Sequence, residues 1–275
     1  MIQIVRPIHA LLNAIFPKKC IFCGATLTMA ASLCICDDCA SHIPYYKGEY
    51  LFEEGRAGGA GEGGVGGSLY CNRIICALKY AGAARRAISG FKFHGRREYG
   101  LTLAALLCER IIGVYGPTAI CDAFDFVTCV PLSHGRLRER GYNQAAILAE
   151  YTARYLNLPF EGGLLERDSR GLRQSSLKRE ERRANVRSSF HVNKDKAYEI
   201  HARMRQRGGA TNNQLLVGAM GDMLREEVTD NQPLALVRII LIDDVATSMS
   251  TINACAAALK AAGAYEVTGA VLAAP

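Results

Sequence analysis

The spacing of apolar residues predicts helices in the first half of the chain. Between Leu69 and Gly116 the apolar positions recur with the period of an amphipathic helix. The clearest stripe shares one helix face and comprises Leu103, Leu106, Leu107, Ile111 and Val114. Helices with such a face need a partner surface against which to bury it.

Later runs have the apolar, β-branched character of strands. FDFVTCVPLS occupies 124–133, RIILIDDV occupies 238–245, and EVTGAVLAA occupies 266–274. Helical stretches separate these runs, one beginning near Asn143 and one ending at Gly263. Strands that alternate with helices predict a mainly parallel sheet.

Polar chemistry gathers in the loops that follow the predicted strands. Ligands of parallel α/β sheets bind beyond the carboxyl ends of the strands. The loops at 132–142 and 243–251 each follow a strand directly, so we expect both at that edge of the sheet.

Two segments lack the pattern of packed elements. Residues 50–68 are rich in glycine, which predicts a flexible linker. Residues 191–234 are polar and aperiodic, which predicts an insertion with a short helix at about 215–227.

Length and charge narrow the class of protein. A chain of 275 residues can bury the core of one α/β domain with a small accessory module. The formal net charge is +7, and between Arg167 and Arg187 eight Arg or Lys residues stand against three acids. That run predicts an anion site, for phosphate or nucleic acid, or else a solvated face. No apolar run approaches the roughly 18 to 20 residues of a membrane helix, and no signal peptide is recognisable, so we expect no membrane insertion and a cytoplasmic location.

Paired cysteines near the start predict a metal site. Cys20 and Cys23 form one CxxC pair, and Cys36 and Cys39 form another after twelve intervening residues. Two such pairs complete the four-thiolate shell of structural zinc, which implies a reducing compartment. Coincidentally spaced free thiols are the alternative reading, and Cys34 is an alternative ligand to Cys36. The other cysteines lie in apolar surroundings and are expected in the core: Cys71, Cys76, Cys108, Cys121, Cys129 and Cys255.

The stretch RIILIDDVATSMST joins an apolar strand to acids and hydroxyls. Asp243 and Asp244 interrupt the apolar run, which places them at the sheet edge, where a diol or a magnesium ion can meet them. Four hydroxyls then lie beside the start of a helix, whose free N–H groups favour an anion such as a monophosphate: Thr247, Ser248, Ser250 and Thr251. The alternative is an acidic turn followed by Ser/Thr capping of an alanine-rich helix.

A basic loop follows the strand predicted at 124–133. Arg136, Arg138 and Arg140 lie between that strand and the helix that begins near Asn143. Closely spaced guanidinium groups suit pyrophosphate or a nucleic-acid backbone. A solvated basic turn is the alternative.

The stretch from Arg238 to Thr251 resembles the fingerprint of type I phosphoribosyltransferases, in which an apolar strand, two acids and two further residues precede Thr-Thr-Gly-x-Thr. The resemblance implies that Asp243 and Asp244 approach the ribose hydroxyls of phosphoribosyl pyrophosphate (PRPP), bound with magnesium. It also implies a 5-phosphate loop made of Thr247, Ser248, Met249, Ser250 and Thr251. Met249 stands where the family has glycine, and we expect its side chain to crowd the loop or to disfavour the positive φ that glycine tolerates.

Further motifs narrow the resemblance to the ComF family, which is linked to bacterial competence. Pro131-Leu132 and the run Arg140-Gly141-Tyr142-Asn143-Gln144 are similar to motifs of that family. Phe16-Pro17 before the cysteines is similar too, and the family carries a zinc ribbon at this place. A spaced set also resembles the family: Arg167, Gln174, Leu177, Arg182, Asn185 and Phe190.

The ComF resemblance implies a fold and roles for individual residues. The implied fold is a type I phosphoribosyltransferase-like α/β domain, a mainly parallel sheet flanked by helices, with a small N-terminal zinc ribbon. Residues 1–49 then hold an N-terminal helix and the ribbon, 50–68 the linker, and 69–275 the main domain with its insertion at about 191–234. The implied catalytic residues are Asp243, Asp244, Arg140 and Arg182. The phosphate contacts implied outside the hydroxyl loop are Lys92, Asn143, Gln144 and Gln174.

Two functions are compatible with these features. The first is binding of PRPP with magnesium, or phosphoribosyl transfer from it; no nucleophile or acid–base pair is evident, which fits a transfer driven by stabilising the leaving group. The alternative is a non-catalytic zinc-ribbon protein that binds single-stranded DNA in natural transformation, with DNA-uptake proteins as partners. The arginine-rich loops, with Tyr142 and Phe190 near them, favour this alternative.

Overall fold

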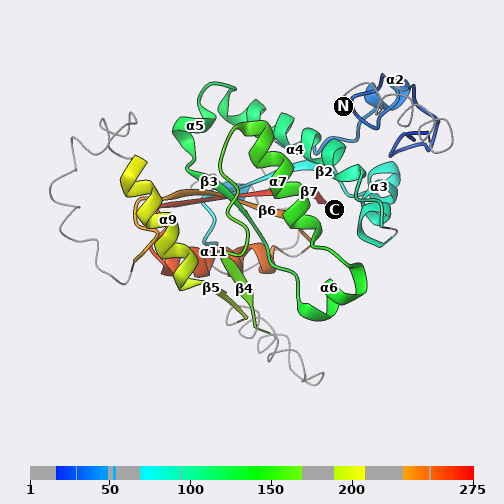
Figure 1. The fold of residues 1–275 in the computed structure, drawn as a ribbon. Helices are drawn as coiled ribbons and strands as arrows, with labels where there is room; N and C mark the ends of the chain where they lie inside the picture. Colours follow the sequence, from blue (N-terminus) through cyan, green and yellow to red (C-terminus); the bar gives the residue numbers. More distant parts are fainter. Residues whose placement is uncertain are drawn as a thin grey trace, which may run out of the picture.

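A five-stranded sheet forms the centre of the molecule in a computed structural model of the protein (Figure 1). The structure describes residues 17–28, 30–48, 52–53, 69–93, 95–168, 189–207, 232–247 and 249–275. In spatial order, the strands of this sheet are β1 (Phe52–Glu53), β2 (Arg73–Lys79), β7 (Glu266–Ala274), β6 (Arg238–Val245) and β3 (Phe126–Cys129). A separate antiparallel pair consists of β4 (Leu165–Arg167) and β5 (Phe190–Val192).

Helices connect the strands and flank the sheet, except α2 (Asp37–Ala40), which belongs to the N-terminal cysteine module (Figure 1). The others are α3 (Gly82–Phe93), α4 (Tyr99–Tyr115), α5 (Ile120–Ala123), α6 (His134–Arg140), α7 (Gln144–Leu156), α9 (Lys194–Arg207) and α11 (Ser250–Ala261). The predicted strands in 124–133, 238–245 and 266–274 and the helices that follow the first two are therefore confirmed as β3, β6, β7, α7 and α11.

The sheet is mainly parallel. β2, β7, β6 and β3 all run in one direction, and only the short edge strand β1 is antiparallel to its neighbour. The C-terminal ends of β2, β3 and β6 consequently meet at one edge of the sheet. The predicted fold class, a mainly parallel sheet flanked by helices with a small N-terminal cysteine module, is confirmed.

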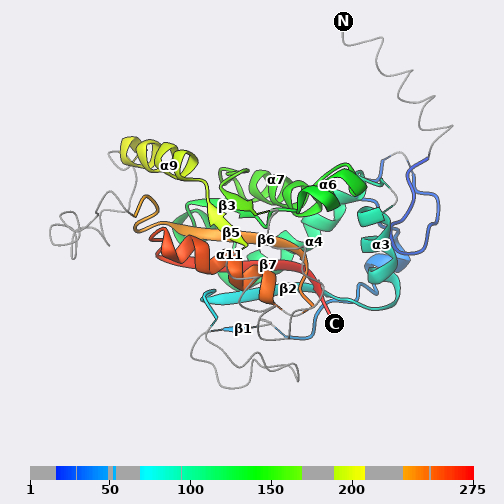
Figure 2. The same ribbon diagram turned by 90° about the horizontal axis from the view of Figure 1, so that it is seen from below.

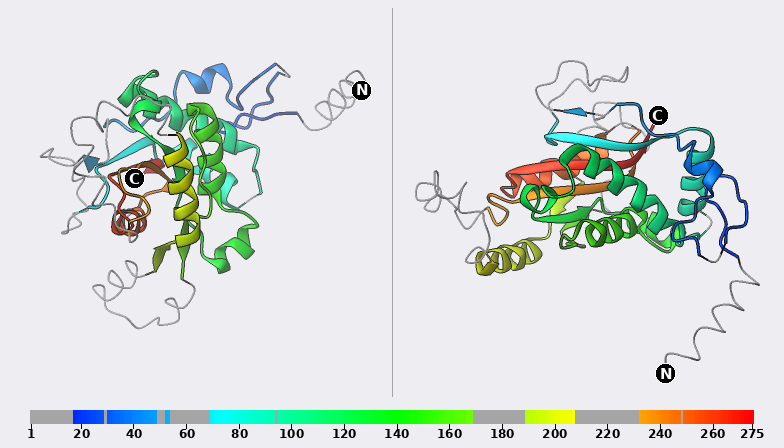
Figure 3. Two further views of the ribbon diagram at one scale, coloured as in Figure 1. Left: turned by 60° about the vertical axis from the view of Figure 1, so that its left-hand side comes forward. Right: turned by 90° about the horizontal axis from the view of Figure 1, so that it is seen from above.

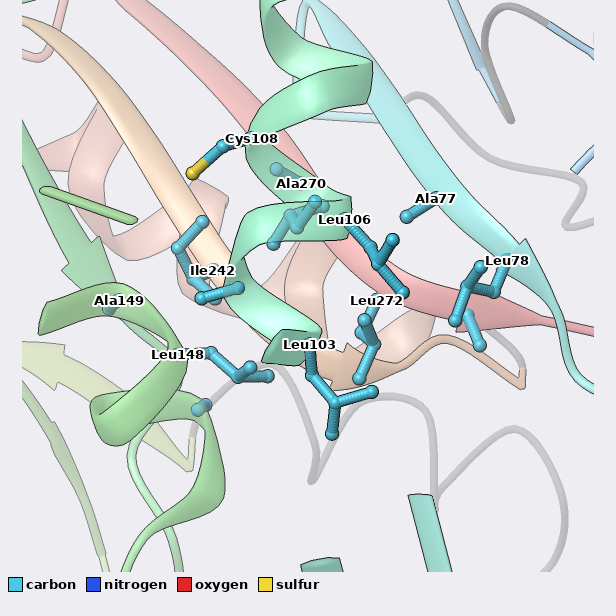
Figure 4. Packing of buried hydrophobic residues seen from close by; sticks show 14 of the residues in the cluster. Ala77, Leu78, Leu103, Leu106, Cys108, Leu148, Ala149, Ile242, Ala270 and Leu272 are labelled. Atoms are coloured by element: carbon cyan, nitrogen blue, oxygen red, sulfur yellow. The ribbon is translucent and has the colours of Figure 1, made fainter. Parts of the chain in front are cut away.

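The central strands are buried on both faces. In β6, Ile240 and Ile242 belong to the apolar cluster that contains α4 and α7, whereas Ile239 and Leu241 belong to the cluster that contains α11. Figure 4 shows Ile242 among side chains of the first cluster, and Figure 2 shows α7 lying over the strands. Burial on both faces explains why β6 reads as a continuous apolar run rather than an alternating one.

The strand β2 corrects the prediction of helical structure from Leu69 onward. Residues Ile74 to Leu78 are all buried, and β2 pairs along its length with β7. A short apolar run has the same appearance in a buried strand as in a buried helix, so its pattern alone did not separate the two. The prediction is confirmed from α3 onward, and the stripe centred on Leu103 lies in α4.

Two polar segments form helices where the sequence predicts irregular structure. The basic segment after β3 is the short helix α6, which the Ser133 side chain caps and Gly141 ends with a left-handed φ of 75°. Residues 194–207 form α9. The segment 191–234 reads as aperiodic in the sequence because most positions of α9 are charged or polar and leave no clear apolar stripe. Arg203 of α9 lies 2.7 Å from the buried carboxylate of Glu161. The short helix predicted at about 215–227 lies outside the described residues.

The cysteine module packs directly against the α/β domain. Ile21 and Phe22 are buried in the same cluster as residues of α3 and α4, and the Cys34 N–H donates to Thr102 Oγ1 of α4 at 2.9 Å. The Lys79 N–H at the end of β2 donates to the Pro44 carbonyl at 2.8 Å, so the chain runs from the module onto the sheet. The module and α9 lie at opposite ends of the molecule (Figures 1 and 3).

The glycine-rich linker lies largely outside the described residues, and within it Phe52–Glu53 form β1. Of the cysteines expected in the core, Cys71, Cys76, Cys108, Cys129 and Cys255 are buried. Cys121 is exposed, which corrects that expectation, because the short helix α5 buries only Ile120.

Candidate functional site

Three chain segments meet at the C-terminal edge of the parallel strands. The helix α3 follows β2, the helix α6 follows β3, and the hydroxyl loop follows β6. These segments lie together toward the α3 and α6 side of the molecule (Figures 1 and 2). The segments that follow β3 and β6 therefore lie at the edge of the sheet where the sequence predicts them.

The carboxyl groups of Asp243 and Asp244 lie near the end of β6. Asp243 Oδ1 accepts the Asp244 N–H at 2.8 Å, and Asp244 Oδ1 accepts the Val245 N–H at 2.6 Å. The other oxygen of Asp244 lies 2.9 Å from Lys92 Nζ at the end of α3. The fold thus brings three predicted site residues together from two elements that are far apart in sequence.

Asp243 has an unusual protonation equilibrium. Burial raises the pKa of its carboxyl group to about 7, and the nearby charge of Asp244 acts in the same direction. The Asp244 N–H and the cations Lys92 and Arg136 lower it by less than burial raises it. A carboxyl with this pKa is protonated in part of the molecules near neutral pH.

The hydroxyl loop keeps a backbone shape that glycine normally supplies. Met249 has a φ of 53° and directly precedes α11, and its carbonyl accepts the Asn253 N–H at 2.9 Å. Met249 thus has the positive φ that we expected it to disfavour, and its partly buried side chain packs against the cluster that contains α11. The alternative expectation, that this side chain crowds the loop, stays a prediction. Ser250 and Thr251 form the first turn of α11 and Thr247 is exposed, while Ser248 lies outside the described residues.

Substitutions at Met249 should separate the needs of its backbone from those of its side chain. Met249→Val should lower the free energy of unfolding by about 1–3 kcal/mol, because a β-branched residue tolerates the left-handed region poorly. Met249→Gly should change it by no more than about 1 kcal/mol, since relief of strain offsets the lost contacts and the greater flexibility of the unfolded chain. Urea unfolding of both variants measures the difference, and equal destabilisation would show that packing alone matters here.

The predicted phosphate contacts Asn143 and Gln144 have partners inside the protein. Asn143 caps α7, and its Nδ2 donates to the Val130 carbonyl at 3.0 Å. The buried Gln144 donates through Nε2 to the Lys92 carbonyl at 3.3 Å and accepts from Arg140 Nη1 at 3.0 Å. In this structure both side chains fix the loops around the site, and their contact with phosphate stays a prediction.

Arginines lie over aromatic rings around the end of α3. The guanidinium group of Arg140 lies 4.8 Å from the centre of the Phe93 ring, and its Nε is buried without a hydrogen-bond partner among the described residues. The guanidinium carbon of Arg96 lies 5.5 Å from the centre of the Tyr99 ring, and that of Arg97 lies 4.5 Å from the centre of the Tyr142 ring. The sequence pattern did not single out these two arginines. The available signal was the Arg doublet that follows Lys92 in the sequence.

The remaining predicted residues belong to the strongly basic segment. Arg167 lies on β4, with its guanidinium group 5.2 Å from the centre of the Phe190 ring on β5. Burial lowers the pKa of Arg167, and Arg136 acts in the same direction, so two cations come close there. Gln174, Arg182, Leu177 and Asn185 lie outside the described residues, and their roles stay predictions.

Four thiols come together in the N-terminal module. The Sγ atoms of Cys20, Cys23, Cys36 and Cys39 all lie within 4.8 Å of one another, and those of Cys23 and Cys36 are 3.6 Å apart. Cys34 is not among them, so the fold selects Cys36 over Cys34 as the fourth member.

The surroundings of the four thiols differ: those of Cys20 favour a thiolate, whereas burial raises the pKa of the Cys39 thiol. Burial raises the pKa of Cys20, but the backbone N–H groups around it and the Cys23 thiol outweigh burial and lower that pKa to about 6. The Ala25 N–H donates to Cys23 Sγ at 3.5 Å. Four thiols from two tight turns, with N–H donors aimed at sulfur, fit the closed shell of structural zinc.

The fold and the two sites define an α/β protein with a polar site at the C-terminal edge of a mainly parallel sheet and a module whose four clustered cysteines could hold a metal ion. No protein-family model matches the chain. Among curated proteins, the chain is similar to Competence protein F of Haemophilus influenzae, with 24% identity over 273 residues, covering 92% of this chain and 95% of that protein. This match along nearly the full length of both chains supports assignment of the protein to the ComF family. Among the described helices, none combines the length and the apolar character that crossing a membrane requires.

Proposed function

We propose that the protein binds PRPP together with magnesium at the C-terminal edge of the sheet, and that this site serves a competence-related function. The observation that carries the proposal is the pair of carboxylates at the end of β6, followed directly by the turn at Met249 and the start of α11. The similarity to Competence protein F supports the competence-related part.

The residues present fit the proposed ligand. Magnesium prefers carboxylate oxygens, which Asp243 and Asp244 supply, and when bound it neutralises charge on the phosphates. The positive end of the α11 dipole, with the hydroxyl groups of Ser250 and Thr251 in its first turn, suits the 5-phosphate. Lys92 and the arginines of the α6 region supply positive charge for the pyrophosphate.

The acceptor of a phosphoribosyl group is not defined by these residues, so the proposal covers binding first and transfer second. Transfer would need the developing charge on pyrophosphate to be stabilised, and the cations around the site suit that role. The zinc proposed for the four thiols would act structurally, because four ligands close its shell.

Calorimetry with PRPP and magnesium tests the proposed binding. We expect saturable heat that disappears when either PRPP or magnesium is left out. If millimolar Mg·PRPP gives no heat while the zinc-loaded protein binds DNA well, the proposed function is wrong for this chain.

The affinity for Mg·PRPP should depend on pH through Asp243. Since the pKa of this carboxyl is raised to about 7, magnesium must displace a proton below that pH, and affinity should fall by up to about tenfold per pH unit on further acidification. Calorimetry in buffers of different ionisation enthalpy measures the proton released on binding, with PRPP titrated alone as the control. Binding without proton release at pH 6.5 would contradict this assignment.

Single-stranded DNA binding is the second candidate, and a specific observation favours it. Three arginine–aromatic stacks gather around the end of α3, and Phe93 in one of them is 57% exposed. Cations interleaved with aromatic rings suit a flexible strand of phosphates and bases. Oligonucleotide binding that weakens steeply with salt and persists without PRPP would support this candidate.

A further inference from the structure

The ion pair between Lys92 and Asp244 occupies the place where a cation would bind. Lys92 Nζ lies 2.9 Å from Asp244 Oδ2, and each side chain is only 14% exposed. Backbone N–H groups donate hydrogen bonds to one oxygen of each acid, Asp243 Oδ1 and Asp244 Oδ1. Of the four carboxylate oxygens of this acid pair, only Asp243 Oδ2 has no hydrogen bond or ion pair with the described residues. A metal ion bound by Asp243 Oδ2 and Asp244 Oδ2, the two oxygens that accept no backbone N–H, would therefore take the place of the Lys92 ammonium group.

The residues from Arg140 to Gln144, which join α6 to α7, hold the chain around Lys92 in place. The Tyr142 hydroxyl donates to the Phe91 carbonyl, and Gln144 Nε2 donates to the Lys92 carbonyl at 3.3 Å. The guanidinium group of Arg140 covers the ring of Phe93 and also donates to Gln144. Phe91 and Lys92 are thus held by hydrogen bonds to their carbonyls, and Phe93 by the contact of its ring with Arg140. The part of this segment that can move is therefore the flexible Lys92 side chain.

We propose that Lys92 is a built-in counterion that neutralises Asp244 until magnesium and the sugar phosphate bind together, and that its ammonium group then moves to the phosphates. This inference rests on the proposed function. It also gives the motif from Arg140 to Gln144 a positioning role, which is to place Lys92 between the acids and the phosphates.

The physical reason is the cost of an unpaired charge at low exposure. Magnesium alone would displace the ammonium group from Asp244 and leave it without a carboxylate partner, so binding of the metal alone is weakened. Phosphate oxygens offer the displaced ammonium group a new anionic partner, so PRPP and the metal favour each other's binding. The site consequently discriminates against a free divalent cation and selects the metal–phosphate complex.

The test measures Mn²⁺ binding to the zinc-loaded full chain by electron paramagnetic resonance. In the wild type, we expect weak Mn²⁺ binding that tightens at least about tenfold when PRPP is present. Lys92→Gln should bind Mn²⁺ without PRPP at least about tenfold more tightly than the wild type, and adding Asp244→Asn should abolish that gain. The same Lys92→Gln change should weaken Mg·PRPP binding about tenfold or more. Lys92→Arg keeps the charge and should leave Mn²⁺ binding as weak as in the wild type.

Several outcomes would overturn the inference. Unchanged Mn²⁺ affinity in Lys92→Gln would mean that the ion pair only stabilises the fold. Unchanged affinity of the same variant for Mg·PRPP would mean the same. Zinc content and a thermal melt establish that each variant is folded, and the dependence of Mn²⁺ affinity on PRPP in the wild type tests the coupling without any substitution. If the wild type binds no Mg·PRPP while Lys92→Gln gains Asp244-dependent Mn²⁺ binding, the proposed function fails and the competition between Lys92 and the cation stands.

Discussion

Replacing Cys36 with serine should remove zinc from the N-terminal module, whereas Cys34→Ser should leave the metal in place. The two cysteines are separated by one residue, yet only Cys36 has its sulfur within 4.8 Å of the other three thiols. Folding of small zinc modules draws on the order of 10 kcal/mol or more from the metal, so losing one thiolate should release most of the zinc. Cys34 instead contributes its backbone N–H to Thr102 of α4, a contact that serine at position 34 retains.

Elemental analysis of the purified variants measures this difference. We expect about one zinc ion per chain in the wild type and in Cys34→Ser, and a small fraction of that in Cys36→Ser. Limited proteolysis should then cut Cys36→Ser in the module first, because Ile21 and Phe22 lose the support that keeps them buried against the domain. Equal zinc content in the two variants would refute the assignment of the fourth ligand.

The cysteine module shows how far local spacing leads. Each CxxC pair is a local feature, so the sequence predicts four metal ligands without knowledge of the fold. In the fold, Cys36 joins the other thiols, whereas Cys34 contacts Thr102, a residue that is distant from it in the chain. Nothing in the local spacing encodes that contact, and the sequence therefore left both candidates open.

The candidate site at the sheet edge shows the same division. Asp243, Asp244 and the turn before α11 lie in one continuous stretch, so their order alone predicts a strand, an acid pair and an anion site. The partner of Asp244 comes from α3, and the parallel pairing of β2 with β7 and of β7 with β6 brings that helix to the acids. Since β2 itself reads as helical in the sequence, the arrangement that places Lys92 was not predictable.

Met249 marks a third kind of limit. Residue preferences predict that methionine disfavours a positive φ, and this preference is correct as an average. The loop nevertheless has that φ, and the partly buried Met249 side chain packs against the cluster that contains α11. Tertiary packing thus overrides a local preference at a point where the backbone geometry matters for the proposed phosphate site.

Changing both Asp243 and Asp244 to asparagine should weaken Mg·PRPP binding by at least about 100-fold, or roughly 3 kcal/mol, because both carboxylates that we propose as ligands of the metal and of the ribose hydroxyls are lost. The amide side chains keep the shape of the acids and remove their charge, so the sheet should stay intact. Calorimetry with Mg·PRPP measures the loss. A matched control is Asp195→Asn, which removes one exposed carboxylate on α9, outside the proposed site.

The double variant also separates the two candidate functions. Binding of single-stranded DNA should be little changed, since the arginine–aromatic stacks around the end of α3 do not use these acids. Removing negative charge beside a basic surface should, if anything, strengthen that binding slightly and make it no less sensitive to salt. Retention of full Mg·PRPP affinity by the double variant would move the sugar-phosphate site away from β6. Loss of DNA binding together with PRPP binding would instead mean that one site, centred on the acids, serves both ligands.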